Sequence, residues 1–286
     1  MTLTVTPFFD PATFSYSYVV SEPGGAAAII DTVLDFDPVS GRATTTNADQ
    51  IVAFVREQGL QVEWLLETHI HADHLSAAQY LKKQLGGTVA VGAAVTQVQL
   101  AFSRVFNAGP DFPADGSQFD RLLNEGEELA LGASAIKVLA TPGHTPACIT
   151  YVVENNAFVG DTLFMPDYGT ARTDFPGGDA DQLYASIQKI LALPDDTKLY
   201  MCHDYGTKTR TEFACQTTVA RERAENIHIN DNIDQATFVE FRTCRDRDLA
   251  APRLLYPAVQ FNMRAGAFAA PEDNGQAYIK IPVRYA

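Results

Sequence analysis

The feature that most constrains this chain is a run of six residues that holds four potential metal ligands: His69, His71, Asp73 and His74. Three of the chain's six histidines lie in this run. Imidazole and carboxylate groups are common ligands of protein-bound metals, and scattered surface histidines would not be concentrated in this way. We therefore interpret the run as part of a metal site.

The residues on either side predict how this run is presented. The apolar run 62–66 predicts a buried strand, and the spacing of apolar residues over 75–85 predicts a helix. Alternate residues of a strand share a face, so the first two histidines are expected to point to the same side. The aspartate and the third histidine are expected in the first turn of the helix, where the helix dipole favours a carboxylate.

Three later predicted strands also end in a potential ligand. His144 follows one of them through a Pro-Gly turn, and Asp161 follows the strand at 157–159. His203 follows the strand that begins at Lys198. Alone, each of these is more often an ordinary turn residue or a buried structural residue. Together, four strand ends that each supply His or Asp indicate one site at the edge of a sheet.

The cysteines are expected to be structural. Cys202 is adjacent to His203 in a predicted strand, so it should face the opposite side and act as a core thiol, not a ligand. No Cys-x-x-Cys pattern occurs among the four widely spaced cysteines, Cys148, Cys202, Cys215 and Cys244. Free thiols in a chain that starts without a signal-like segment predict a reducing, cytoplasmic location.

The net charge and the lengths of the apolar runs argue against two classes of partner, nucleic acid and membrane. The chain of 286 residues has 35 acidic and 21 basic residues and a net charge of −14. This balance disfavours nucleic acid, which needs a basic surface to neutralise phosphates. No run approaches the ~18 apolar residues that a membrane-spanning helix needs, so no membrane partner is expected. The sequence leaves the oligomeric state open, including a homodimer.

The order of predicted elements indicates two layers of strands. Alternating or continuous apolar runs predict strands at 3–9, 14–20, 26–30, 62–66, 88–91, 127–131, 135–141, 149–153, 157–160 and 198–202. Helical periodicity covers 49–58, 75–85, 93–106, 179–193, 211–226 and 234–246, and residues 247–286 are not assigned. We expect an α/β protein in which two sheets pack face to face with helices outside.

These motifs resemble the metallo-β-lactamase superfamily. They are His-x-His-x-Asp-His at 69–74, Gly-His-Thr at 143–145, Gly-Asp at 160–161 and His203. The resemblance implies an αββα sandwich over residues 1–205 with the site at one edge, and a C-terminal helical extension over 206–286 packed on the same domain. The presence of Asp161 and the absence of a signal-like segment argue against β-lactam hydrolysis.

The ligand set is compatible with two metal centres. In the first, His69, His71 and His144 hold one zinc ion, Asp73, His74 and His203 hold a second, and Asp161 bridges them, as in glyoxalase II, a thioester hydrolase. In the second, only His69, His144 and Asp161 bind, and two histidines with one carboxylate suit non-haem Fe(II). Ligand count leaves both interpretations open.

The flanking residues resemble persulfide dioxygenases of the bacterial type, over 67–75, 164–175, 203–205 and 226–228. This resemblance implies one Fe(II) per chain on His69, His144 and Asp161, with glutathione persulfide and O₂ as substrates. His71, Asp73, His74 and His203 would then orient ligands and water through hydrogen bonds.

The same resemblance implies the residues that bind substrate. Arg172 matches the family's substrate-binding arginine, and Tyr205 matches a tyrosine of the same pocket; Thr145 and His228 are assigned to this pocket as well. A surface ion pair between Arg172 and Asp174 is the alternative interpretation of that arginine. His228 is a departure, because mitochondrial-type members have an arginine there.

Overall fold

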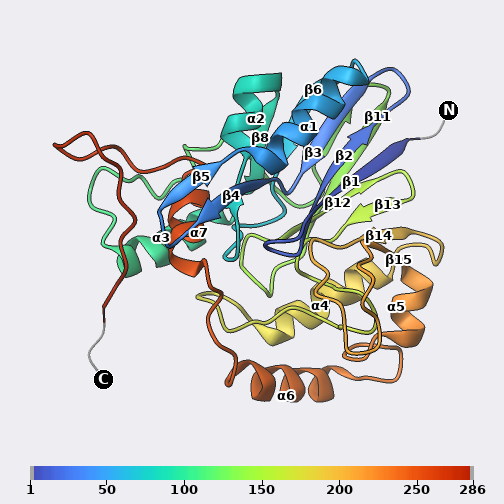
Figure 1. Cartoon of the computed structure of the whole chain (residues 1–286). Coiled ribbons are helices and arrows are strands. Elements are labelled where there is room, and N and C mark those ends of the chain that lie inside the picture. The colour runs from blue at the N-terminus through green and yellow to red at the C-terminus, as the bar shows by residue number, and fades with distance from the viewer. Residues whose placement is uncertain (1–2, 284–286) are drawn as a thin grey trace.

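The central strands are apolar on both faces, and this pattern requires a layer on each side. In β3 (Ala26–Ile30), Ala27 and Ile29 pack among helices on one face, whereas Ala28 and Ile30 pack against a second sheet on the other. The computed structural model, which describes residues 3–283, shows two sheets between two groups of helices (Figure 1). The predicted α/β, αββα architecture is confirmed.

The first sheet has six strands and combines antiparallel and parallel pairs. Its order is β1 (Thr4–Asp10), β2 (Ser15–Ser21), β3, β6 (Gln61–Leu66), β8 (Thr88–Gly92) and β9 (Arg121–Leu123). The pairs from β1 to β3 are antiparallel, and those from β3 to β9 are parallel. Its outer face packs in one apolar cluster with α1 (Thr46–Glu57), α2 (Ala78–Leu85), α3 (Val95–Phe106) and α7 (Leu255–Asn262).

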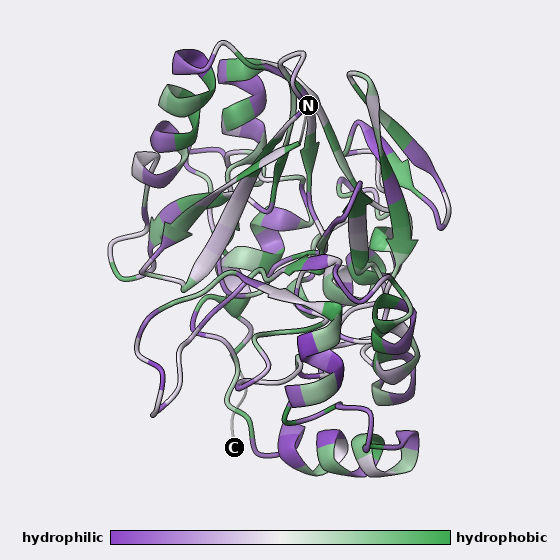
Figure 2. Cartoon of the chain, turned by 90° about the vertical axis from the view of Figure 1, so that its right-hand side faces the viewer, coloured by the Kyte–Doolittle hydropathy of each residue, from purple (hydrophilic) through white to green (hydrophobic). Residues whose placement is uncertain are grey.

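The second sheet also has six strands. Its order is β10 (Glu128–Leu131), β11 (Ser134–Ala140), β12 (Ile149–Val153), β13 (Asn156–Phe158), β14 (Lys198–Tyr200) and β15 (Gln216–Thr218). Its outer face packs against α4 (Ala180–Leu191), α5 (Val219–Glu225) and α6 (Gln235–Asp246). Figure 2 shows helices that are hydrophobic on one side and hydrophilic on the other, as this layering requires.

The two sheets share an apolar core. Tyr18, Tyr151 and Phe158 are fully buried in it, and the rings of Tyr18 and Phe158 lie edge to face with centroids 5.2 Å apart. The Tyr18 hydroxyl donates to the Met201 carbonyl at 2.5 Å, which ties the first sheet to the segment that follows β14. This contact fixes the two sheets close to the strand end that carries His203.

The helix expected over 75–85 starts later than predicted. Leu75 and Ser76 form the short strand β7 (Leu75–Ser76), which pairs with β4 (Val33–Asp37); β4 also pairs with β5 (Arg42–Thr44). Since α2 begins at Ala78, Asp73 and His74 lie in a loop and not in a first helical turn. The expected interaction of Asp73 with the helix dipole was therefore wrong.

The region beyond residue 205 contributes to both halves of the sandwich. Part of the helix expected over 211–226 is instead β15, because residues 216–218 pair with β14. The unassigned region contains α7, whose apolar residues join the cluster on the first sheet. No helix in residues 3–283 is both long and apolar enough to span a bilayer.

A buried acid on α5 makes the stability of the fold depend on pH. The Glu222 side chain is fully buried; its Oε2 accepts from Asn226 Nδ2 at 2.6 Å, and its Oε1 has no hydrogen-bond donor within residues 3–283. Burial raises the pKa of Glu222 to about 8. The folded state therefore holds this proton at pH values where the unfolded chain has released it.

We expect Glu222→Gln to be more stable than the wild type at pH 8 and similar to it at pH 4.5. A pKa raised in the folded state gives stability that is complete below the unfolded pKa and lost as pH rises toward 8. The amide cannot ionise, so the variant should gain roughly 2–4 kcal/mol relative to the wild type across this range. Urea unfolding at several pH values measures the difference. A difference that is constant with pH would contradict the prediction.

Candidate metal centre

The predicted ligands come from strand ends of both sheets and meet at one edge of the sandwich. The run 69–74 follows β6 of the first sheet. His144 follows β11, Asp161 follows β13 and His203 follows β14, all in the second sheet. The structure thus brings together all seven side chains that the sequence singled out as ligands.

His69, His144 and Asp161 form one compact group. Each offers a ligand atom, and these atoms all lie within 4.8 Å of one another. Asp161 Oδ2 is 3.8 Å from His69 Nε2 and 3.7 Å from His144 Nε2. Ligand atoms bound to one ion at about 2.1 Å are roughly 3.0–3.5 Å apart, so a small contraction would place an ion between them.

His71, Asp73, His74 and His203 form a second group beside the first, again with ligand atoms within 4.8 Å. His203 Nε2 is 3.3 Å from Asp73 Oδ2 and 3.4 Å from Asp161 Oδ1, so the two groups adjoin at His203 and Asp161. The geometry accommodates one ion in the first group or one ion in each.

Hydrogen bonds fix the rings of the first two histidines. His144 Nδ1 donates to the Arg172 carbonyl at 2.8 Å, because a carbonyl oxygen only accepts. The Thr68 hydroxyl donates to Asp31 Oδ2 at 2.8 Å, so it has no proton left for His69 Nδ1, 3.0 Å away, and must accept from it. Both rings therefore direct an Nε2 lone pair toward Asp161.

His71 is oriented oppositely, with Nε2 toward protein acceptors and Nδ1 toward the site. The acceptors are two carboxylates that the sequence analysis missed. Its Nε2 lies 3.1 Å from Asp31 Oδ1 and 3.1 Å from Glu67 Oε2, so Nε2 carries the proton and Nδ1 faces the site. Burial alone would lower the pKa of His71, but Asp31 and Glu67 raise it well above its usual value. Asp31 follows the end of β3 just as Asp161 follows β13, and this position was a usable signal.

Other charges in the site suit a cation. Burial, followed by the neighbouring His71, lowers the pKa of both His69 and His74, so these rings are neutral, as ligands must be. Burial alone would raise the pKa of Asp73, but His203 and His74 lower it well below its usual range. Burial alone would lower the pKa of His203, but Asp73 and Asp161 raise it well above its usual value, as the carboxylates beside His71 do for that ring. His69 and His74 are therefore already in the neutral form that binds metal, whereas His203 and His71 would have to release a proton when an ion binds them.

The strongest structural sign of a metal is a set of buried atoms that lack hydrogen bonds. Within residues 3–283, six such atoms belong to the two groups: His69 Nε2, His71 Nδ1, Asp73 Oδ2, His74 Nε2, Asp161 Oδ1 and His203 Nε2. A buried polar atom without a partner costs free energy, so six in one place would be unfavourable without a ligand. Nitrogen and oxygen donors fit both zinc and iron.

A glycine allows the second sheet to approach the first at this point. Gly160 has a φ of +54°, and a Cβ atom there would lie 2.6 Å from Thr68 Oγ1. A side chain at this position would therefore push Asp161 away from His69.

Asn262, the last residue of α7, hydrogen-bonds the backbone of the loop at residues 71–76, which carries three of the predicted ligands. Its Nδ2 donates to the His71 and His74 carbonyls at 2.9 and 2.8 Å, and its Oδ1 accepts from Ser76 N at 2.8 Å. Ser76 in turn donates to Glu67 at 2.5 Å. The C-terminal region thus sets the backbone that carries these predicted ligands, and no local sequence signal marked this role.

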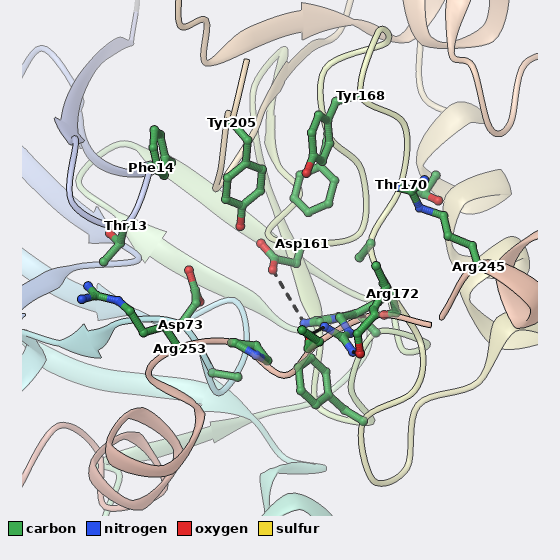
Figure 3. Close-up of a pocket in the computed structure, with 18 of the residues that line it drawn as sticks. Thr13, Phe14, Asp73, Asp161, Tyr168, Thr170, Arg172, Tyr205, Arg245 and Arg253 are labelled. Atoms are coloured by element: carbon green, nitrogen blue, oxygen red, sulfur yellow. Dashed lines mark hydrogen bonds and ion pairs between the residues drawn. The ribbon is translucent and has the colours of Figure 1, made fainter. Parts of the chain in front are cut away.

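A cavity of about 360 Å³ opens over the metal centre. Asp73, His144 and Asp161 line it, together with the aromatic residues Phe14, Phe164, Tyr168, Phe175 and Tyr205. Figure 3 shows Tyr168 and Tyr205 side by side near Asp161, with Arg245 beside Thr170 and Arg253 on the opposite side, near Thr13. Within residues 3–283, neither Arg245 nor Arg253 takes part in an ion pair, unlike Arg172 and Arg242, which also line the cavity.

Two of the predicted substrate residues line this cavity. Tyr205 stacks on His203, with ring centroids 5.4 Å apart and an interplanar angle of 9°. Arg172 lines the cavity, but its guanidinium also donates to both oxygens of Asp174, at 2.5 and 2.6 Å, and to the Ala250 carbonyl at 2.7 Å. The ion pair with Asp174 is therefore present, and the substrate-binding role of Arg172 stays a prediction.

The other two predicted substrate residues, Thr145 and His228, do not line the cavity. The Thr145 hydroxyl lies 3.2 Å from Cys148 Sγ, and His228 Nδ1 accepts from Thr170 N at 3.0 Å. Burial lowers the pKa of His228 to about 3, so the ring is neutral and supports the Thr170 backbone from behind. Neither residue lines the cavity, so the assignment of Thr145 and His228 to substrate binding stays a prediction without structural support.

The prediction for Cys202 also needs correction. All four cysteines are free, and Cys202 is buried as expected. Its sulfur, however, lies within 4.8 Å of ligand-type atoms of Asp31 and His71 and, in a second group, of Asp161 and His203, so it borders the metal centre and not an apolar core. Burial raises the pKa of this thiol, which disfavours the thiolate that would bind metal.

We expect Asn262→Ala to weaken metal binding by about tenfold, because the 71–76 loop loses three hydrogen bonds that orient its ligands. Competition with a chromophoric chelator measures the affinity. Gln260→Ala on the same helix is the matched control, since Gln260 bonds Tyr256 and Lys280 and not the ligand loop. Equal affinities for the two variants would contradict a role for Asn262 in the site.

Comparison with known proteins identifies the family. The profile of the metallo-beta-lactamase superfamily matches residues 10–203. A probable metallo-hydrolase of Burkholderia pseudomallei (strain 1710b) is 57% identical over 98% of this chain and 99% of its own length. The mitochondrial persulfide dioxygenase ETHE1 of Bos taurus is 31% identical over 92% of this chain and 89% of its own. The crystal structure of ETHE1 from Myxococcus xanthus superposes with a TM-score of 0.73 at 27% identity, covering 92% of this chain and 99% of that one. The chain belongs to the metallo-beta-lactamase superfamily.

Proposed function

We propose that this chain is an iron-dependent persulfide dioxygenase that acts on glutathione persulfide. The observation that carries the proposal is the group of His69, His144 and Asp161 beneath a cavity lined by arginines. Two histidines and one carboxylate on one side of an ion are typical of non-haem Fe(II) oxygenases. Similarity to ETHE1 over nine-tenths of the chain, in sequence and in fold, supports the same assignment.

His69, His144 and Asp161 would hold the iron. His69 Nε2 and Asp161 Oδ1 have no hydrogen-bond partner in the described chain, and Asp161 Oδ2 lies 3.8 and 3.7 Å from the Nε2 atoms of His69 and His144. Fe(II) would supply the redox chemistry that O₂ requires and that zinc lacks. His71, Asp73, His74 and His203 would orient water and the bound groups from the other side of Asp161.

The proposed reaction consumes one persulfide anion, one O₂ and one water, and yields glutathione, sulfite and one proton. The terminal sulfur loses four electrons and O₂ gains four, so no other oxidant or reductant is needed. The chain's own residues would bind and orient the thiol-bearing peptide and limit the access of water.

The cavity's charge supports an anionic substrate. The protein carries a net charge of −14, yet four arginines line this cavity: Arg172, Arg242, Arg245 and Arg253. Arg245 and Arg253 are exposed to the cavity without an ion pair in the described chain, so their guanidinium groups are available to the two carboxylates of glutathione. Phe14, Tyr168 and Tyr205 provide apolar surface between them.

A dinuclear zinc thioester hydrolase is the second candidate. The free Nδ1 of His71 and the second group of ligands favour it, since they could hold a second ion. The name of the Burkholderia relative, a probable metallo-hydrolase, points to the same reaction class.

The two candidates differ in their need for O₂. We expect the purified protein to consume O₂ when glutathione persulfide is added and to release one sulfite per O₂, as measured with an oxygen electrode and a sulfite assay. Asp161→Ala should abolish both, because one of three iron ligands is lost. Hydrolysis of a glutathione thioester without O₂ uptake would favour the zinc enzyme instead.

We expect Arg245→Ala to raise KM for glutathione persulfide roughly 10- to 100-fold, because an arginine–carboxylate contact contributes roughly 1.5–3 kcal/mol. Metal content should not change, since Arg245 touches none of the predicted ligands in the described chain. Arg247→Ala, two residues along and also exposed, is the matched control. Steady-state kinetics measures KM, and an unchanged KM in Arg245→Ala would exclude this arginine from substrate binding.

A further inference from the structure

Ser15, the first residue of β2, lies beneath the metal centre, and neither the sequence motifs nor the proposed reaction gives it a role. It is fully buried, and its Oγ lies 3.3 Å from His74 Nδ1 and 3.2 Å from His203 Nδ1. One hydroxyl therefore contacts two of the rings in the second group.

The backbone holds Ser15 in this position. Ser15 forms a β-bridge with His203, and the neighbouring Tyr16 N donates to the Cys202 carbonyl at 2.7 Å. On the other side, Asp204 N donates to the Phe14 carbonyl at 3.1 Å. Because these bonds join β2 to the end of β14, the Ser15 backbone is held beside both rings.

The direction of each hydrogen bond follows from counting protons. The Asp10 carboxylate only accepts, and it accepts from Thr13 Oγ1 at 2.5 Å and from Thr13 N at 3.0 Å. The Thr13 hydroxyl has then used its one proton. Since Ser15 Oγ is 2.8 Å from Thr13 Oγ1, Ser15 is the donor in that contact. The Thr13 carbonyl, 3.4 Å from Ser15 Oγ, can only accept as well, so the one serine proton points toward Thr13 in either case.

The serine hydroxyl, in turn, has no second proton to give. Its two oxygen lone pairs can accept, so the Nδ1 atoms of His74 and His203 donate to it. The other acceptor near His74 Nδ1 is Asp73 Oδ1, which at 3.6 Å is beyond hydrogen-bond distance. The Nε2 atoms of both rings then face the metal centre, where neither has a hydrogen-bond partner in the described chain. His69 is fixed in the same way by Thr68, whose proton goes to Asp31.

We propose that Ser15 is a positioning residue that holds His74 and His203 with the proton on Nδ1, so that each ring directs Nε2 toward the metal centre. The chain Asp10–Thr13–Ser15 at the β1–β2 turn supplies the directed hydrogen bonds. The inference holds whether the metal centre has one ion or two. With two ions, the Nε2 atoms are ligands of the second ion; with one ion, they face the water and substrate beside it. It rests on hydrogen-bond direction and not on the proposed reaction.

The test reads the tautomer of His74 directly. An imidazole with its proton on Nδ1, one with its proton on Nε2 and a doubly protonated ring have different ring ¹⁵N shifts, so one spectrum distinguishes the three forms. Long-range ¹H–¹⁵N correlation spectra of the full chain, labelled at histidine, report which nitrogen carries the proton. Spectra are recorded with Zn²⁺ bound and after its removal by a chelator, and a His74→Gln variant assigns the signal.

We expect His74 to carry its proton on Nδ1 in the wild type in both spectra. In Ser15→Ala without metal, the hydroxyl acceptor is gone, and the Nδ1–H form should be replaced largely by the Nε2–H form that free imidazole side chains prefer. Ser17→Ala is the matched control: Ser17 is also fully buried, two residues along the same strand, and its hydroxyl has no partner within residues 3–283. That variant should match the wild type.

Either of two results would overturn the inference. One is a wild-type spectrum of the metal-free protein in which His74 carries the proton on Nε2, and this result does not depend on any variant folding. The other is a Ser15→Ala spectrum in which the Nδ1–H form persists as in Ser17→Ala. Neither measurement involves turnover, so failure of the proposed dioxygenase activity would leave this test intact.

Discussion

The hydrogen bonds of one buried carboxylate, Asp31, organise the metal centre. Asp31 Oδ1 accepts from Thr68 N at 2.7 Å, and Oδ2 accepts from the Thr68 hydroxyl at 2.8 Å. The same carboxylate contacts His71 Nε2 at 3.1 Å. Burial alone would raise the pKa of Asp31, but His71 and the donors of Thr68 lower it, so the group is ionised. Through these contacts Asp31 orients His69 and His71 at once.

This arrangement depends on the whole sandwich. Asp31 adopts a left-handed backbone conformation, with a φ of +52°, at the end of a strand buried between helices and the second sheet. A buried charge needs several hydrogen bonds, and the strand end of β6 supplies them. The second sheet then adds His144, Asp161 and His203 from its own strand ends, and α7 fixes the loop from behind through Asn262. The unfavourable burial of so many unpaired lone pairs is offset only if an ion binds them.

The sequence was sufficient to single out the candidate metal ligands, because each group of them follows an apolar run that forms a strand. Four apolar runs that each end in His or Asp were enough to expect convergence at one sheet edge, because strand ends of a sandwich share that edge. The residues that orient the ligands could not be found in this way. Ser15 and Asn262 act through contacts with residues about 60 to 190 positions away, and nothing in their neighbours marks them.

Other errors have equally specific causes. Leu75 and Ser76 continue a helical pattern in sequence, yet pairing with β4 draws them into a strand and delays α2. The motif around His228 resembled a substrate-binding segment, but His228 hydrogen-bonds Thr170 and does not itself line the cavity. The arginines that do line the cavity, Arg245 and Arg253, lie on and after α6, in a region without a recognisable motif. In each case, contacts between residues far apart in the sequence determine the structure, and the local sequence pattern does not contain them.

The central claim is that His69, His144 and Asp161 form a mononuclear iron site. The most direct test is the identity and number of metal ions in the protein purified under anaerobic, reducing conditions, measured by elemental analysis against protein concentration. The account predicts about one iron per chain, lost in Asp161→Ala and retained in His74→Ala. Two zinc ions per chain, with one of them lost in His74→Ala, would contradict it.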